Sequence, residues 1–204
     1  MVRFTIIVLY LATFSKHFHS EEINKENLFN FLNTKQFISS NFTQITKSPL
    51  KERVVKGSIK ATRNGSFRLE YFEPFKEIIS SDSDFLYKVD LELEQVDIIP
   101  RQDFFKDTPI SLFITQSHDL NELYSVDDCI KKDKTTICTL SPLSSDSFIE
   151  KLSLRFSENL LISLRYEDAF EQSILINFSQ ISWKPFDKSE LLISFPEGID
   201  VVYH

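Results

Sequence analysis

The two cysteines are the residues best placed to react with each other. Cys129 and Cys138 flank the polar segment 131–134, which lies between two short runs of strand-like sequence. A hairpin that turns at Asp133 and Lys134 would place the two thiols opposite each other, where a disulfide is geometrically feasible. We expect this disulfide in an oxidising compartment, and a pair of free thiols is the alternative. A metal-binding or catalytic use is disfavoured because no histidine or third cysteine lies nearby in sequence.

Histidine is too scarce to support most hydrolytic or metal chemistry. Two of the four histidines, His17 and His19, lie at the N-terminal end, and His204 is the last residue. Only His118 remains for a Ser-His-Asp triad or a histidine-based metal site, so we predict no metal and no cofactor. The three glycines form no phosphate-binding loop. Carboxylates are abundant, but they are typical of a solvated outer strand face, and the inventory predicts a protein that is not an enzyme.

The first 20 residues are typical of a signal peptide. Arg3 supplies a positive charge, and residues 4–14 form an apolar run of 11 residues, which suits a signal-peptide core better than a membrane span. We predict cleavage after Ser20, export, and a single domain over residues 21–204; an uncleaved N-terminal anchor is the alternative.

The net charge argues against two classes of partner. The whole chain carries −7, and cleavage after Ser20 would remove Arg3 and Lys16 and leave −9. Nucleic acids and anionic membrane surfaces bind clusters of Lys and Arg, so we expect neither as a partner. A basic protein partner remains compatible with the negative net charge.

Most of the body alternates apolar and polar residues with a period of two, which predicts β-strands. Short polar segments separate these runs, which favours antiparallel connections. The alternating sets are Phe67, Leu69 and Tyr71; Phe85, Tyr87 and Val89; Leu152, Leu154 and Phe156; Leu160, Ile162, Leu164 and Tyr166; Ile174, Ile176 and Phe178; and Leu191, Ile193 and Phe195.

Two helices are expected beside these strands. Residues 22–33 place apolar side chains on one helical face, and segment 107–109 (Asp-Thr-Pro) is a helix-start signature before the apolar segment 110–114. We therefore predict a mainly β fold: one curled antiparallel sheet of about ten strands, with its apolar concave face covered by the two helices. The pattern alone leaves open whether that face is a packed core or a ligand cavity.

Several ordered motifs bear on that question. Together they resemble the outer-membrane lipoprotein carrier family, LolA, over essentially the whole of residues 21–204. The motifs are Phe42-Thr43-Gln44; Gly57; Arg63; Gly65-Ser66-Phe67-Arg68-Leu69-Glu70-Tyr71; Pro74; Ile78-Ile79-Ser80-Ser81-Asp82; Leu86-Tyr87; Asp90; Leu93-Glu94-Gln95-Val96; Thr108-Pro109; and Phe195-Pro196-Glu197-Gly198-Ile199-Asp200-Val201.

The chain departs from the family pattern at four positions. Asn64 stands where the family usually has Pro, and Leu69 where it has Trp. Ser83 replaces a turn glycine, and Glu197 replaces the second proline of the C-terminal motif. These departures bear on cavity shape and turn geometry.

The resemblance implies an incomplete β-barrel with a hydrophobic cavity for the acyl chains of lipoproteins, closed by lid helices. It further implies a periplasmic monomer that takes cargo from the inner-membrane Lol transporter complex and delivers it to the outer-membrane receptor LolB, with only transient contact with membrane complexes. In such a protein Arg63 would hydrogen-bond the lid helices and hold the empty state shut; the alternative is an outward, solvated arginine in a turn, with Arg68 close enough to compete for the role. We expect the cavity residues to be Phe67, Leu69, Tyr71, Ile79 and Tyr87, and the lid residues to be Leu28, Leu32, Ile110 and Phe113.

Three other functions compete with the carrier. The receptor LolB shares the fold but needs a cysteine just after its signal, and none occurs before Cys129. A secreted β-barrel module that binds another apolar ligand or mediates a signalling interaction remains the alternative. A periplasmic hydrolase is opposed by the shortage of histidine.

Overall fold

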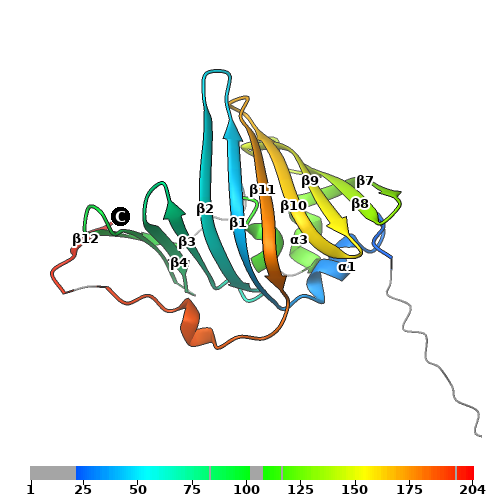
Figure 1. Ribbon diagram of the computed structural model, residues 1–204. Helices are drawn as coiled ribbons and strands as arrows, with labels where there is room; N and C mark the ends of the chain where they lie inside the picture. Colours follow the sequence, from blue (N-terminus) through cyan, green and yellow to red (C-terminus); the bar gives the residue numbers. More distant parts are fainter. Residues whose placement is uncertain (1–21, 83, 102–107, 116, 196) are drawn as a thin grey trace, which may run out of the picture.

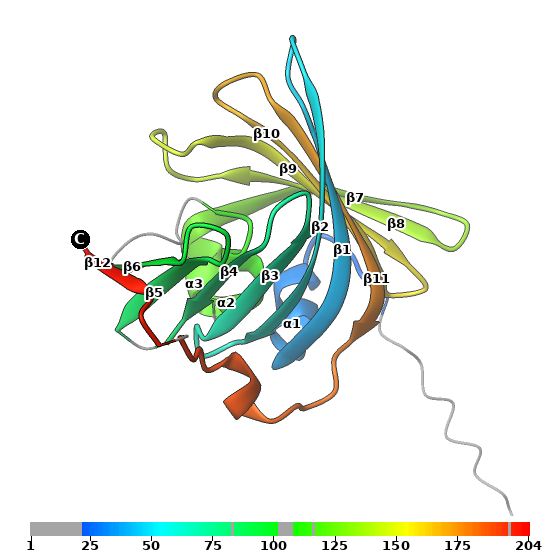
Figure 2. The same ribbon diagram turned by 60° about the vertical axis from the view of Figure 1, so that its left-hand side comes forward.

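The polypeptide forms one large curled sheet with short helices inside the curve (Figures 1 and 2). The structure is a computed structural model, and it describes residues 22–204 except 83, 102–107, 116 and 196. Within those residues the sheet has 12 strands in the order β12-β6-β5-β4-β3-β2-β1-β11-β10-β9-β8-β7. The two edge strands β7 and β12 do not pair in that order, so the barrel is incomplete. The predicted mainly β fold, curled and open, is confirmed.

The elements have the following bounds. The strands are β1 Phe37–Lys47, β2 Glu52–Thr62, β3 Phe67–Glu73, β4 Glu77–Ser81, β5 Phe85–Asp90, β6 Gln95–Pro100, β7 Tyr124–Lys132, β8 Thr135–Pro142, β9 Ile149–Ser157, β10 Leu160–Asp168, β11 Ser173–Ser182 and β12 Asp200–Tyr203. The helices are α1 Leu28–Asn33, α2 Ser111–Ile114, α3 Ser117–Leu123 and the 3-10 helix η1 Lys188–Leu191.

Neighbouring strands are antiparallel, and short connections join most of them; the exception is β12, which pairs parallel with β6. β1 sits in the middle of the sheet and pairs with β2 along its whole length and with β11 on its other side. Strands β1 and β11 are far apart in the sequence, and their pairing joins the N-terminal and C-terminal halves of the sheet.

Helices α1, α2 and α3 lie on the concave side of the sheet and close its core (Figure 2). Leu28 and Leu32 of α1 and Leu112 of α2 are all fully buried in this core. The helix predicted over residues 22–33 begins later, at Leu28. Asn24 and Asn27 each accept a hydrogen bond from the other's backbone N–H, and the Leu28 N–H donates to the Asn24 carbonyl, so residues 25–27 form a turn that leads directly into the helix.

The chain between β11 and β12 runs along the outer side of the sheet (Figures 1 and 2). The strand predicted at Leu191–Phe195 is wrong, because η1 ends at Leu191 and the next strand among the described residues is β12. Asp187 caps η1 by accepting from the backbone N–H of Ser189, which fixes a helical turn there. The segment contacts the sheet through the ring pair Phe186 and Phe37, the ion pair Glu190 and Lys60, the carbonyls of Leu191 and Leu192 with Ser80 and Arg68, and the ring pair Phe195 and Tyr87.

Cys129 and Cys138 are joined by a disulfide across the β7–β8 pair, where they occupy directly opposite positions. The turn between the strands contains Asp133 with φ of 54°, the left-handed conformation that a short-side-chain acid tolerates. The predicted signal peptide, residues 1–20, lies outside the described residues. Among the helices that the structure describes, none is long and apolar enough to span a membrane.

Candidate functional site

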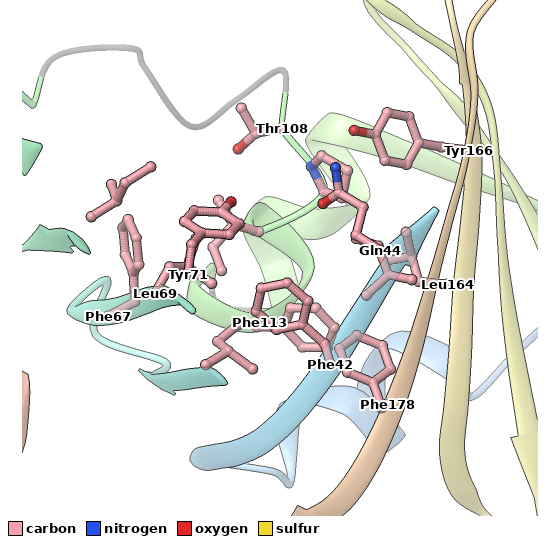
Figure 3. A pocket seen from close by; sticks show the side chains of 15 residues that line it. Phe42, Gln44, Phe67, Leu69, Tyr71, Thr108, Phe113, Leu164, Tyr166 and Phe178 are labelled. Atoms are coloured by element: carbon pink, nitrogen blue, oxygen red, sulfur yellow. The ribbon is translucent and has the colours of Figure 1, made fainter. Parts of the chain in front are cut away.

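An apolar cavity of about 240 Å³ lies between the concave face of the sheet and α2 (Figure 3). Strands from both halves of the sheet contribute to its wall, and the segment leading into α2 contributes its cover. The lining residues are Phe42, Gln44, Ile59, Phe67, Leu69, Tyr71, Ile79, Thr108, Pro109, Ile110, Phe113, Leu164, Tyr166, Ile176 and Phe178.

The aromatic wall of the cavity depends on a glycine. Gly57 of β2 pairs with Phe42 of β1 on one side and Tyr71 of β3 on the other. The rings of Phe42 and Tyr71 meet edge to face above it, with centroids 5.8 Å apart. A Cβ at position 57 would lie 2.7 Å from the Phe42 ring and 2.3 Å from the carbonyl oxygen of Glu70. The absence of a side chain therefore lets the two rings close over β2.

Four of the five expected cavity residues, Phe67, Leu69, Tyr71 and Ile79, line the cavity. Tyr87 does not. It pairs with Ser80, whose hydroxyl donates to Leu191 in the outer segment, and its own ring lies 6.0 Å from Phe195 on that side.

The outward position of Tyr87 has a simple physical cause. Side chains alternate faces along a strand, so the choice between Leu86 and Tyr87 as the inward residue depends on register alone. Leu86 pairs with Ser81, which pairs with Phe67, and this register turns Leu86 inward and Tyr87 outward.

The expected lid residues divide into two groups. Ile110 and Phe113 line the cavity, and the Phe113 ring packs edge to face on Phe178 with centroids 5.9 Å apart. Leu28 and Leu32 are fully buried in the core under α1 but do not line the cavity. The direct cover of the cavity is therefore α2 and the segment before it.

Several lining residues were absent from the expected set, although the sequence carried signals for most of them. Phe42 and Gln44 stand in the Phe-Thr-Gln motif of β1, and Tyr166 and Phe178 end or complete alternating runs. What the sequence lacked was the pairing of β1 with β11, which brings these residues onto one wall.

Arg63 connects the sheet to both helices that close the core. It lies in the turn between β2 and β3 and is only 3% exposed. Its Nη2 donates to the carbonyl of Leu32 at 2.7 Å, and its Nε donates to that of Lys35 at 3.2 Å. Its Nη1 donates to the carbonyls of Leu112 and Thr115, each at 2.7 Å. The carbonyls of Leu32 and Leu112 belong to α1 and α2, and those of Lys35 and Thr115 lie just after these helices, where the helical hydrogen-bond ladder ends.

Burial affects the charge of this arginine without removing it. Loss of solvent lowers the pKa of Arg63 from 12.5 to about 10, so the guanidinium stays charged at neutral pH. Its planar fork of N–H groups can serve several carbonyls at once, which a lysine ammonium does less well.

A polar vestibule adjoins the cavity where β1 turns into β2 and β10 turns into β11. Lys51, Arg53, Glu77 and Asp168 contribute its charged groups. The Arg53 guanidinium lies 4.7 Å from the centroid of the Phe75 ring. The site is thus apolar inside and charged at its mouth, an arrangement suited to a ligand with an apolar and a polar end.

An open, curled β-sheet with an apolar cavity under short helices defines a class of protein that binds apolar ligands. A sequence profile described as "Outer membrane lipoprotein carrier protein LolA" matches residues 33–191. The chain therefore belongs to the LolA family, whose members are periplasmic and not enzymes.

Individual relatives agree with this assignment. The chain is similar to a protein of Chromohalobacter salexigens named "Outer-membrane lipoprotein carrier protein", with 33% identity over 148 residues, 72% of this chain and 70% of the relative. A protein of the same name from Legionella pneumophila is 28% identical over 201 residues, which cover 97% of this chain and 98% of the relative. An uncharacterised conserved protein of Thermus thermophilus shares the fold, with a TM-score of 0.57 at 9% identity over 88% of this chain and 98% of that one.

Proposed function

We propose that this protein carries lipoproteins by their acyl chains, with the cavity between the sheet and α2 as the binding site. The observation that carries the proposal is the continuous apolar lining, from Phe42 and Phe178 on the sheet to Ile110 and Phe113 on the cover. Membership of the LolA family and the names of the relatives support lipoproteins as the cargo.

The energetics suit such a carrier. Each methylene moved from water into an apolar site is worth about 0.8 kcal/mol, so exposing several acyl chains would cost tens of kcal/mol. A wall of aromatic and aliphatic side chains offsets that cost without directional bonds. The attraction then depends on contact area, so cargo can be released when the cover moves.

The cavity must enlarge to accept its cargo. An engineered cavity of about 150 Å³ holds one benzene molecule, and the present cavity of about 240 Å³ is not much larger. We propose that α1 and α2 swing away to admit the chains, and that Arg63 is the latch that holds them in the closed state. Among the residues that the structure describes, Arg63 bonds only backbone carbonyls of the helix ends and the segments just after them, so opening breaks these hydrogen bonds but separates no ion pair within that part of the chain.

We propose that residues 1–20 direct export to the periplasm and that residues 21–204 act there as one carrier domain. A single sheet joins the described strands of that range, which supports one folding unit. We further propose that the carrier is a monomer, that it loads at the inner-membrane Lol transporter complex and that it unloads to the outer-membrane receptor LolB.

A pair of matched variants tests the binding site. Leu69→Asp places a charge in the cavity wall, whereas Ile130→Asp places the same charge on β7, where the side chain is 64% exposed. Native mass spectrometry of the purified proteins should find acylated species on the wild type and on Ile130→Asp but not on Leu69→Asp. Equal acyl loading of all three proteins would contradict the cavity as the site.

Depletion in the host tests the biological role. After depletion, membrane fractionation should find lipoproteins retained in the inner membrane, and re-expression of Ile130→Asp but not of Leu69→Asp should restore sorting. Lipoproteins that reach the outer membrane normally without the protein would contradict carriage.

A further inference from the structure

Three residues stand at the boundary between the apolar cavity and the polar vestibule. Gln44, Tyr71 and Tyr166 are the described residues that line both spaces, and each ends in a hydrogen-bonding group. Figure 3 shows the rings of Tyr71 and Tyr166 on opposite sides of the Gln44 side chain. We call these three residues the collar.

The topology explains how the collar is assembled. Gln44 lies on β1, Tyr71 on β3 and Tyr166 on β10, so each tyrosine lies two strands away from β1 on a different side. In a flat sheet the two phenols would be far apart, but the curl brings them toward each other. The two phenols are close enough to interact electrostatically, since Tyr71 is one of the groups that raise the pKa of Tyr166.

The collar hydroxyls are available to a ligand. In the part of the chain that the structure describes, neither the Tyr71 nor the Tyr166 hydroxyl makes a hydrogen bond. Gln44 uses one amide N–H on Thr46, at 3.3 Å, and keeps the other. Burial raises the pKa of both phenols, with Glu77 adding to the effect at Tyr71 and Asp168 at Tyr166. Both hydroxyls therefore remain protonated donors across the physiological pH range.

We propose that the collar binds the ester and amide carbonyl groups that join acyl chains to the polar part of the cargo. This inference rests on the proposed function. The two tyrosine O–H groups and the Gln44 amide N–H are hydrogen-bond donors. The carbonyl oxygen at the junction of an acyl chain and its headgroup is the matching acceptor. With the chains in the cavity, that junction falls at the collar, and the polar part of the cargo lies in the vestibule beside Arg53 and Asp168.

The collar also sets how deeply the chains enter. A carbonyl drawn past the collar would lose its donors in an apolar space, whereas a carbonyl left outside would keep apolar methylenes in the vestibule. The apolar wall supplies affinity without a fixed depth, and the collar supplies the depth.

The test compares two lipids that differ only in carbonyl groups. Dioctanoylglycerol has two ester carbonyls, and dioctylglycerol ether has the same chain length with none. Each is titrated against the full-length exported protein carrying a displaceable fluorescent alkyl probe. We expect the wild type to bind the diester about tenfold more tightly than the diether, as two modest hydrogen bonds predict.

Single hydroxyl deletions locate the effect. Tyr71→Phe and Tyr166→Phe keep the rings and should each weaken diester binding about threefold while leaving diether binding unchanged. Tyr87→Phe is the matched control, because its hydroxyl bonds Asp82 away from the cavity, and it should change neither affinity.

Equal wild-type affinity for the diester and the diether would overturn the collar and leave the proposed function standing. Phe variants that weaken both lipids alike would overturn the collar in the same way. Failure of the wild type to bind either lipid would overturn the proposed function and the collar together. A further arm with an N-octanoyl amide in place of the diester distinguishes amide from ester recognition, and selective weakening by the same variants supports the collar for amides.

Discussion

The Nη1 atom of Arg63 lies 2.7 Å from the carbonyl oxygen of Leu112, although the two residues are 49 positions apart in the chain. This contact joins the β2–β3 turn to α2, and the same guanidinium also reaches Leu32 at the end of α1. One buried side chain thus contacts both α1 and α2, which are separated in the chain by strands β1 to β6. Its removal should affect the cover more than the sheet.

Arg63→Leu is expected to loosen the cover and leave the sheet folded. Four carbonyls in and just after α1 and α2 would lose the hydrogen bond from Arg63, at a cost of about 3 kcal/mol of unfolding free energy. Hydrogen exchange should quicken in α1 and α2 and stay slow in β1 and β11, and transfer of cargo to the receptor should be impaired. Arg63→Lys should lie between the two, because an ammonium serves fewer carbonyls.

Arg68→Leu is the control for Arg63. Arg68 lies five residues away and bonds Glu70 and the carbonyl of Leu192 in the outer segment, so helix exchange should stay at the wild-type rate. If hydrogen exchange in α1 and α2 is as slow in Arg63→Leu as in the wild type, or if the variant transfers cargo normally, Arg63 is not the latch.

Gly57→Ala is expected to destabilise the cavity wall. The added methyl group would meet the Glu70 carbonyl at 2.3 Å and the Phe42 ring at 2.7 Å, so β2, β3 or the ring must shift. Such overpacking costs about 2 kcal/mol, which a urea titration would measure as a lower midpoint at unchanged slope. Ser58→Ala is the neighbouring control on β2 and should stay within about 0.5 kcal/mol of the wild type.

The strands of this fold could be predicted from sequence because each carries its own period-two signal. The faces of those strands could not. Phe67 and Tyr87 belong to equally regular alternating runs, yet the register with β4 turns one inward and the other outward. Which face of a strand points inward is decided by its pairing register with the neighbouring strand, so the sequence of one strand alone does not determine it.

The residues expected in the cover also lie in two different places. The proline at position 109 marks the start of the segment that carries Ile110 and Phe113, and both line the cavity. Leu28 and Leu32 share a helical face as expected, but that face packs into the core beside the cavity. Helix α1 docks through contacts distant in sequence, among them the Phe31 ring on Phe156 and the hydrogen bonds from Arg63, which local periodicity does not encode.

Reduction of the Cys129–Cys138 disulfide is expected to lower the unfolding free energy by about 2 kcal/mol. The bond closes a loop with a sequence separation of 9, and a short loop gains less from closure than a long one. Thermal unfolding with and without reductant measures the difference. A double variant, Cys129→Ala with Cys138→Ala, should unfold near the temperature at which the reduced wild type unfolds, and reductant should not change that temperature. If reductant does not lower the unfolding temperature of the wild type either, the disulfide does not stabilise the fold.

Tyr166 should make the protein less stable at alkaline pH. Burial, Asp168 and Tyr71 raise its pKa from 10.0 to about 12 in the folded state. Between these values the unfolded chain releases the phenol proton while the folded protein keeps it, so the free energy of unfolding falls as pH rises. From about pH 9 to about pH 11 the loss from this group is about 1 kcal/mol. Comparing the wild type with Tyr166→Phe by urea unfolding isolates it, because the other titrations are shared. The stability difference between the two proteins should shift by this amount in favour of the variant, and a difference that stays constant with pH would contradict the raised pKa.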